Sequence, residues 1–268
     1  MIDIGVNLTN SQLLSSAEAV LKRAYKAGIH HCVITGTDID SSQQAIQLAV
    51  EFDEAFPGML SCTVGIHPHD AKDSSSASIE QLRELSQHFK VVAIGETGLD
   101  FNRNYSPQDK QIESFEAQIE LAAETGKPLF LHERDAFEKE IEILRYYRDS
   151  ISDAVVHCFT GDKKALFSYL DMDLHIGITG WVCDERRGAE LAKIIANIPL
   201  NRLMVETDAP FLLPKNISPK PTSRTNEPAF LPWVVQKVAS CFNESEDVIA
   251  AATSNTAKCF FRLMNQEK

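Results

Sequence analysis

The chain has 268 residues, of which 44% are hydrophobic and 24% are charged, and its formal net charge is −12. These proportions are typical of a globular protein and exclude a chain that is disordered throughout. The acidic balance argues against a protein that grips long duplex DNA by its phosphates. It does not exclude a nucleic-acid substrate, because a bound metal ion can supply positive charge locally.

Cysteine usage and apolar runs indicate the compartment. The six cysteines include no CxxC pair, which favours reduced thiols in a chain of this size. The first residues, MIDIGVNL, lack the basic and apolar regions of a signal peptide. No apolar run approaches the ~20 residues that span a bilayer. We therefore expect a cytoplasmic protein without a membrane partner.

Short apolar runs and amphipathic segments alternate along the chain. The apolar runs predict strands at residues 1–8, 30–36, 60–67, 91–96, 128–132, 154–159, 174–180 and 202–207. The amphipathic segments predict helices at residues 11–27, 40–55, 79–88, 107–125, 135–147, 163–170 and 187–197. Such alternation predicts a parallel α/β sheet, and eight units in this length predict a (β/α)8 TIM barrel forming one domain over residues 1–268. The proline-rich segment 209–232 is expected to be a long loop after the last strand.

Side chains that can hold a metal ion stand at the carboxyl ends of the predicted strands, where enzymes on this barrel place their sites. They are His67, Glu96, His132, His157, Glu206 and Asp208. Any one of them is as readily a structural residue, but together they predict a site for one or two divalent ions of the Mg, Mn or Zn type. Such a site indicates a metal-dependent hydrolase, because a bound ion activates water at neutral pH.

Two acids and one histidine are candidates for catalysis. Asp208 or Glu206 could act as general base, and pairing of Glu206 with an arginine is the structural alternative. His67 could donate a hydrogen bond to the substrate, whereas His69 is expected to be a solvated loop residue. Cys158 is expected to face away from His157, because neighbours on a strand point to opposite faces.

Arginines after the strands are candidates for binding phosphate. Arg134 and Arg224 are the two that we select, although pairing with neighbouring acids is the alternative for each. The chain has no glycine-rich phosphate loop, so we expect no nucleotide cofactor.

The motifs GIHPHD, AIGETGLDFNRN, LHERDA, VHCFTG, GITGWVCDERRG and VETDAP resemble, in order and spacing, the TatD family of metal-dependent deoxyribonucleases. The resemblance spans nearly the whole chain. It implies a TIM barrel, magnesium-type metal dependence and hydrolysis of DNA phosphodiesters, with 3′-to-5′ exonuclease action on single strands for some members. It also implies that Glu96, His132, His157 and Asp208 are metal ligands, with His67 and Glu206 in the site. We accordingly expect DNA ends or single-stranded DNA as substrate, a monomer, and a role in DNA repair.

One departure concerns the first strand. Many relatives carry His-x-His there, whereas this chain has Gly5 and Asn7 in those places. Gly5 cannot ligate, and Asn7 offers a neutral amide oxygen to a substrate or a weakly bound second ion. We therefore expect one tightly bound ion and a weaker oxygen-rich site that favours Mg²⁺, with Mn²⁺ and Zn²⁺ as alternatives.

Two other functions remain open. An amidohydrolase or deacylase, for example one acting on D-aminoacyl-tRNA, would share the barrel. Its usual dinuclear form would use first-strand histidines and a bridging lysine, which this chain lacks. A non-catalytic scaffold would not need the ligand set that the sequence carries.

Overall fold

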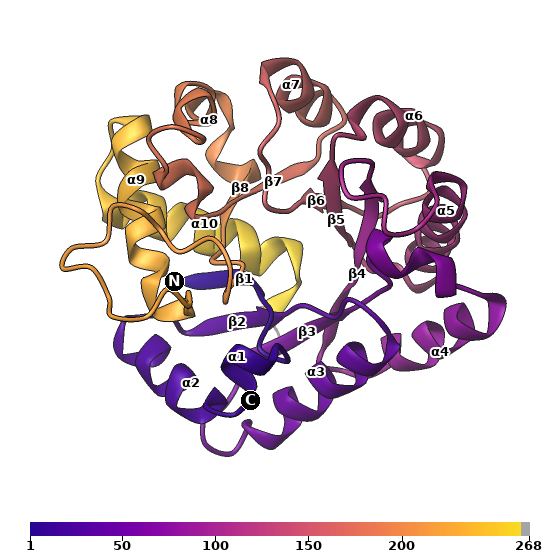
Figure 1. The fold of residues 1–268 in the computed structure, drawn as a ribbon, viewed down its shortest axis with the longest axis horizontal. Helices are drawn as coiled ribbons and strands as arrows, with labels where there is room; N and C mark the ends of the chain where they lie inside the picture. Colours follow the sequence, from indigo (N-terminus) through magenta and orange to yellow (C-terminus); the bar gives the residue numbers. More distant parts are fainter. Residues whose placement is uncertain (264–268) are drawn as a thin grey trace.

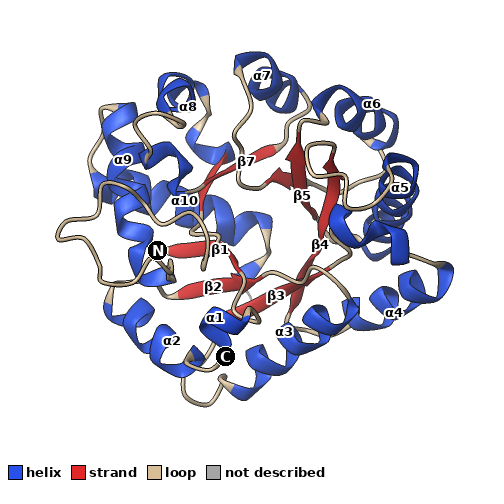
Figure 2. Cartoon of the chain, in the orientation of Figure 1, coloured by secondary structure: helices blue, strands red, loops and turns tan. Residues whose placement is uncertain are grey.

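Eight parallel strands pair in chain order from β1 to β8 in the computed structural model, which describes residues 1–263. Their bounds are β1 Ile2–Val6, β2 His31–Ile34, β3 Leu60–Val64, β4 Val91–Asp100, β5 Leu129–Arg134, β6 Ala154–Val156, β7 His175–Ile178 and β8 Leu203–Val205. The helices form a ring outside the strands (Figure 1, Figure 2). The prediction of a TIM barrel is confirmed. The last five residues of the predicted domain lie outside the described residues.

The helices follow the strands in alternation. They are α1 Ser11–Leu14, α2 Ala17–Lys26, α3 Ile39–Glu51, α4 Ser76–Ser86, α5 Gln108–Thr125, α6 Phe137–Tyr147, α7 Lys163–Asp171, α8 Ala189–Ile194, α9 Leu231–Phe242 and α10 Glu246–Phe260. Short 3-10 segments lie at η1 Pro68–Asp73, η2 Gly180–Cys183, η3 Ile195–Asn197, η4 Leu200–Arg202 and η5 Pro228–Phe230. Within residues 1–263, none of the helices is long and apolar enough to cross a bilayer.

Strands β3, β6 and β8 end at Val64, Val156 and Val205, two to three residues before their predicted ends, and two other predicted boundaries were also wrong. The helix predicted over residues 11–27 is divided into α1 and α2 at Ser15 and Ser16, residue types whose side chains compete for backbone hydrogen bonds and favour helix ends. Strand β4 continues past Glu96 to Asp100, because its last residues still pair with β5 through Gly98–His132 and Asp100–Arg134. Asp100 therefore joins the strand ends that face the barrel mouth.

The barrel closes between β1 and the residues that follow β8. Val6 forms a parallel bridge with Ala209, the Asn7 amide donates to the Ala209 carbonyl at 2.8 Å, and the Asp208 amide donates to the Gly5 carbonyl at 2.9 Å. Inside the barrel, a cluster of buried side chains from six strands meets the end of α10, including Phe260 and Phe261. The closure holds Asn7 and Asp208 side by side at the barrel mouth.

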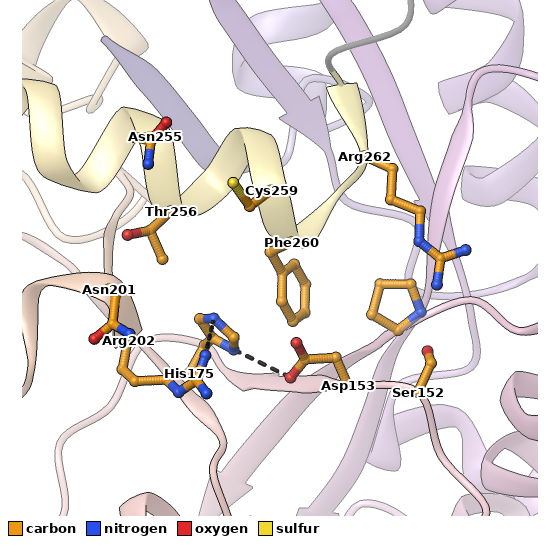
Figure 3. Close-up of a pocket in the computed structure, with 11 residues that line it drawn as sticks. Ser152, Asp153, His175, Asn201, Arg202, Asn255, Thr256, Cys259, Phe260 and Arg262 are labelled. Carbon is orange, nitrogen blue, oxygen red and sulfur yellow. Dashed lines mark hydrogen bonds and ion pairs between the residues drawn. The ribbon is translucent and has the colours of Figure 1, made fainter.

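A small hollow of about 340 Å³ lies at the opposite end, beneath α10 (Figure 3). His175 lies 3.1 Å from Asp153 through Nδ1 and 3.2 Å from Arg202 through Nε2. Because an arginine can only donate, Nε2 accepts and Nδ1 donates to the carboxylate. These groups satisfy one another and tie the starts of β6, β7 and β8 together, which is a structural role.

Two glycines make room for a buried acid under the barrel mouth. A Cβ atom on Gly5 would lie 2.2 Å from Oε2 of Glu206, and one on Gly177 would lie 2.8 Å from Oε1. Gly5 is on β1, Gly177 is on β7, and Glu206 follows β8 between them. The volume that a side chain at position 5 would fill is thus occupied by the Glu206 carboxylate.

We predict that Gly5→Ala destabilises the barrel by about 1–3 kcal/mol, because overpacking displaces Glu206 or strains the backbone. Urea unfolding measures the change. In a Glu206→Ala background the same substitution should have a much smaller effect, since the carboxylate that it meets is gone.

Gly126→Ala is the matched control for this cycle. Its added Cβ meets no atom within 4 Å, although its φ of 65° makes any side chain strained. Its effect should be the same with or without Glu206. Equal effects of Gly5→Ala in both backgrounds would contradict the packing account.

Candidate metal centre

A cleft of about 1360 Å³ opens at the carboxyl ends of the strands. Most of the predicted site residues line it: Asn7, His67, Glu96, His132, Arg134, His157 and Asp208. Glu206 and Arg224 are not among the lining residues. Glu206 is fully buried, and Arg224 is exposed on the loop after β8.

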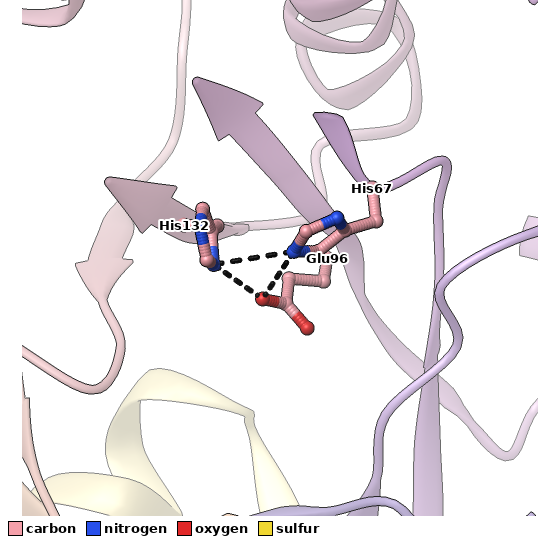
Figure 4. Close-up of side chains that lie close together, drawn as sticks. All are labelled: His67, Glu96 and His132. Atoms are coloured by element: carbon pink, nitrogen blue, oxygen red, sulfur yellow. Dashed lines mark hydrogen bonds and ion pairs between the residues drawn. The ribbon is translucent and has the colours of Figure 1, made fainter. Parts of the chain in front are cut away.

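The Glu96 carboxylate is the centre of the arrangement (Figure 4). Its Oε1 lies 2.8 Å from Nδ1 of His132, 2.8 Å from Nε2 of His157 and 3.3 Å from Nε2 of His67. These side chains come from β4, β5, the end of β6 and the end of β3. Burial alone would raise the pKa of Glu96, but the charge of His157 and the hydrogen bonds from His132 and His157 hold it well below its usual range.

His67 and His132 lie against each other at the same point. Nε2 of His67 is 3.3 Å from Nδ1 of His132, and Nδ1 of His67 accepts from the His69 amide at 3.0 Å. The proton of a neutral His67 is therefore on Nε2, which faces Glu96. Burial lowers the pKa of His67 to about 4, so the ring is neutral at physiological pH.

His157 is held between two carboxylates. Its Nδ1 lies 3.3 Å from Oε2 of Glu206, and the Cys158 amide donates to Oε1 of Glu206 at 2.5 Å. Burial alone would lower the pKa of His157, but the charges of Glu96 and Glu206 raise it well above its usual value. Both oxygens of Glu206 are thus engaged on protein groups, and neither faces the cleft.

Asp208 and Asn7 form the opposite side of the centre. The Asn7 amide group donates to Oδ1 of Asp208 at 2.9 Å, which leaves the Asn7 carbonyl oxygen and Oδ2 of Asp208 without this bond. Burial is the main reason that the pKa of Asp208 is raised to about 7, and the charges of Glu96 and Glu206 add to the effect. This side of the cleft is rich in oxygen atoms, whereas the Glu96 side is rich in imidazole nitrogens.

The donor set fits a divalent metal ion. His67, Glu96 and His132 each present one ligand atom, and these atoms all lie within 4.8 Å of one another. Nδ1 is the His132 nitrogen that faces this point, since Nε2 lies 3.5 Å from Oδ2 of Asp100 and forms no well-aligned hydrogen bond among the described residues. Imidazole nitrogens that converge on one carboxylate oxygen are the donors of a transition-metal or zinc site.

Three residues around this centre differ from the sequence-based expectations. His69 is not a solvated loop residue, because its Nε2 lies 2.8 Å from Oδ2 of Asp100 and its ring contacts that of His67. Asp100 also lies 3.5 Å from Nε2 of His132 and was missed because β4 was predicted to end at Glu96. Cys158 lines the cleft, since it lies beyond β6 with a φ of 46° and the strand alternation no longer applies.

The comparisons with known proteins cover the whole barrel. The profile of the family described as TatD related DNase matches residues 2–262. A Salmonella typhimurium protein named 3′-5′ ssDNA/RNA exonuclease TatD is 45% identical over 264 residues, which are 98% of this chain and 100% of that protein. A Pantoea protein of the same name is 49% identical over 263 residues, again 98% of this chain and 100% of its own.

Solved structures agree in fold. A TatD homologue from Escherichia coli has a TM-score of 0.87 at 26% identity and covers 98% of both chains. A TatD family hydrolase from Entamoeba histolytica has a TM-score of 0.89 at 24% identity and covers 97% of both chains. With the profile match across nearly its full length and relatives of almost half identical sequence, the chain belongs to the TatD related DNase family.

Proposed function

We propose that this protein is a metal-dependent 3′-5′ exonuclease that hydrolyses single-stranded DNA and RNA from their ends. The observation that carries the proposal is the convergence of three imidazole rings on Glu96 in an open cleft of a TatD family barrel. The names of its relatives support the substrate and the direction of cleavage. RNA extends the sequence-based expectation, which was limited to DNA.

The metal ligands are proposed from the two sides of the cleft. Glu96, His132 and His157 would hold one ion on the nitrogen-rich side, with His67 beside them. Asp208 and the Asn7 carbonyl, with Glu96, would hold a second, weaker ion on the oxygen-rich side, which fits Mg²⁺. A bound divalent ion supplies Lewis-acid chemistry: it polarises a phosphoryl oxygen and makes water a better nucleophile at neutral pH.

The two candidate bases differ in their surroundings. Asp208 lines the cleft, and its Oδ2 takes no part in the bond from Asn7, so this oxygen can accept a proton from water. Glu206 is buried and accepts from Cys158 and His157 instead. We therefore assign the proton transfer to Asp208 and give Glu206 a positioning role, in which it holds the His157 ring with Nε2 toward Glu96.

Arg134 is proposed to contact the phosphates, because it is exposed at the end of β5 and lines the cleft. Arg224 remains a weaker proposal, since it lies outside that lining. A monomer without a nucleotide cofactor, a cytoplasmic location, a role in DNA repair and a single domain over residues 1–268 stay predictions.

The direction of cleavage is tested with one single-stranded DNA labelled at either end, in Mg²⁺ or Mn²⁺. We expect the 3′-labelled strand to release labelled mononucleotide at once and the 5′-labelled strand to shorten in steps. The matching duplex should be degraded more slowly, because its last base is paired. Internal cuts in duplex, or release of the 5′ nucleotide first, would contradict the proposal.

The roles of the two acids are separated by metal titration of Glu206→Gln and Asp208→Asn. Loss of a carboxylate that orients a metal-binding histidine lowers metal affinity about 10–100-fold. Glu206→Gln should therefore regain most of its activity in excess metal ion. Asp208→Asn should stay inactive at every metal concentration. An activity loss in Glu206→Gln that excess metal does not reverse would assign Glu206 a direct part in the reaction.

A further inference from the structure

The two rims of the cleft carry different chemistry. Arg103, in the turn after β4, and Arg134, at the end of β5, line one rim and are exposed. Neither guanidinium takes part in an ion pair with the residues that the structure describes, in a protein whose net charge is −12. Unpaired arginines at the mouth of an acidic protein's cleft are suited to phosphate oxygens.

The other rim carries aromatic rings. Trp181 lies in η2 after β7, and Phe211 lies on the loop after β8, and both line the cleft. In the chain order of the barrel, β8 is opposite β4, and β7 is two strands from β5, so the aromatic residues lie on a different part of the cleft's edge from the two arginines. Glu96, His157 and Asp208 line the same cleft.

The backbone of Phe211 is held in place by two hydrogen bonds. The Phe211 amide donates to the Asp208 carbonyl at 2.9 Å, and its own carbonyl accepts from the buried Asn226 at 2.7 Å. The Phe211 side chain is nevertheless 48% exposed. The Phe211 ring is therefore exposed at the cleft, three residues from Asp208, where an unpaired base could contact it.

Trp181 is fixed by a partner of its own. The Arg187 guanidinium, which also lines the cleft and pairs with Asp184, lies over one face of the indole at 4.4 Å from its centre, and the indole N–H donates to the Arg187 carbonyl at 3.2 Å. Gly180 lets this segment meet the Phe211 loop, because a Cβ there would lie 2.2 Å from the Leu212 carbonyl oxygen. The two rings thus belong to two loops that pack on each other.

We propose that Phe211 and Trp181 form a stacking platform for the unpaired base of the 3′-terminal nucleotide, while Arg103 and Arg134 hold the phosphates on its 5′ side. The inference rests on the proposed nuclease function and adds the orientation of the strand. The terminal nucleoside has no further phosphate and goes to the aromatic rings, where Arg187 is paired with Asp184, whereas the polyanionic remainder goes to the unpaired Arg103 and Arg134. A base in duplex cannot reach the platform, which gives a physical reason for single-strand preference.

The activity test compares oligonucleotides that end in a normal nucleotide or in an abasic residue. Stacking of one base on an aromatic side chain corresponds to about 5- to 150-fold in affinity. We expect the wild type to cleave the normal end with a KM lower by that factor, and Phe211→Leu to lose most of the preference. Phe89→Leu is the matched control, because Phe89 is 70% exposed but precedes β4 at the opposite end of the barrel.

The binding test works without turnover. The chain has two tryptophans, so Trp233→Phe leaves Trp181 as the only indole. With a chelator present, single-stranded DNA with a normal 3′ end should quench this fluorescence, and the abasic oligonucleotide should need a higher concentration. Arg103→Ala and Arg134→Ala should each lower the salt dependence of binding by about 0.7 in log–log slope, whereas Phe211→Leu should leave it unchanged.

The outcomes separate this inference from the proposed function. Trp181 quenching that depends on the terminal base, in a protein that degrades no nucleic acid, would support the platform and overturn the nuclease proposal. If normal and abasic ends give the same KM for cleavage and the same quenching of Trp181, in the wild type and in Phe211→Leu, the platform is overturned. The nuclease proposal would not be affected by that result.

Discussion

The buried carboxylate of Glu96 and the three imidazole rings around it are the interaction on which the rest of the site depends. A buried negative charge is unfavourable unless several donors or cations face it. Here His67, His132 and His157 face one oxygen at 2.8–3.3 Å, and they come from three different strand ends. Because the rings meet only if β3, β4, β5 and β6 keep their register, the barrel and the site specify each other.

The surroundings of the site extend this dependence to β1, β7 and β8. Glu206 fits between Gly5 and Gly177 and contacts His157. The absence of a side chain at position 5 therefore makes room for the carboxylate that orients His157. From the sequence alone, Gly5 could be described only as a residue that stands where many relatives have a metal-binding histidine. The proton on His157 and a metal ion would compete for the same nitrogen, which couples metal binding to pH.

The barrel and most of the site were predictable because both follow from local patterns. Apolar runs of five to eight residues identified every strand, and the rule that strand ends face one mouth brought Asn7, Glu96, His132, His157 and Asp208 into one cleft. Boundaries set by pairing were not predictable: Asp100 belongs to β4 only through its register with Arg134. The environments of His69, Cys158 and Glu206 depend on contacts between distant segments of the chain. The hydrophobic periodicity of the sequence carries no information on such contacts.

The central claim is that the Glu96 cluster binds a metal ion, and diffraction from crystals soaked in Mn²⁺ tests it most directly. Anomalous scattering locates the ion without reference to activity. The account predicts one strong peak at about 2.0–2.3 Å from a Glu96 oxygen and from nitrogens of His132 and His157, as in protein sites of nitrogen and carboxylate ligands. Two results would contradict the account. One is a peak elsewhere in the cleft while His67, His132 and His157 still contact Glu96, and the other is no peak at saturating Mn²⁺.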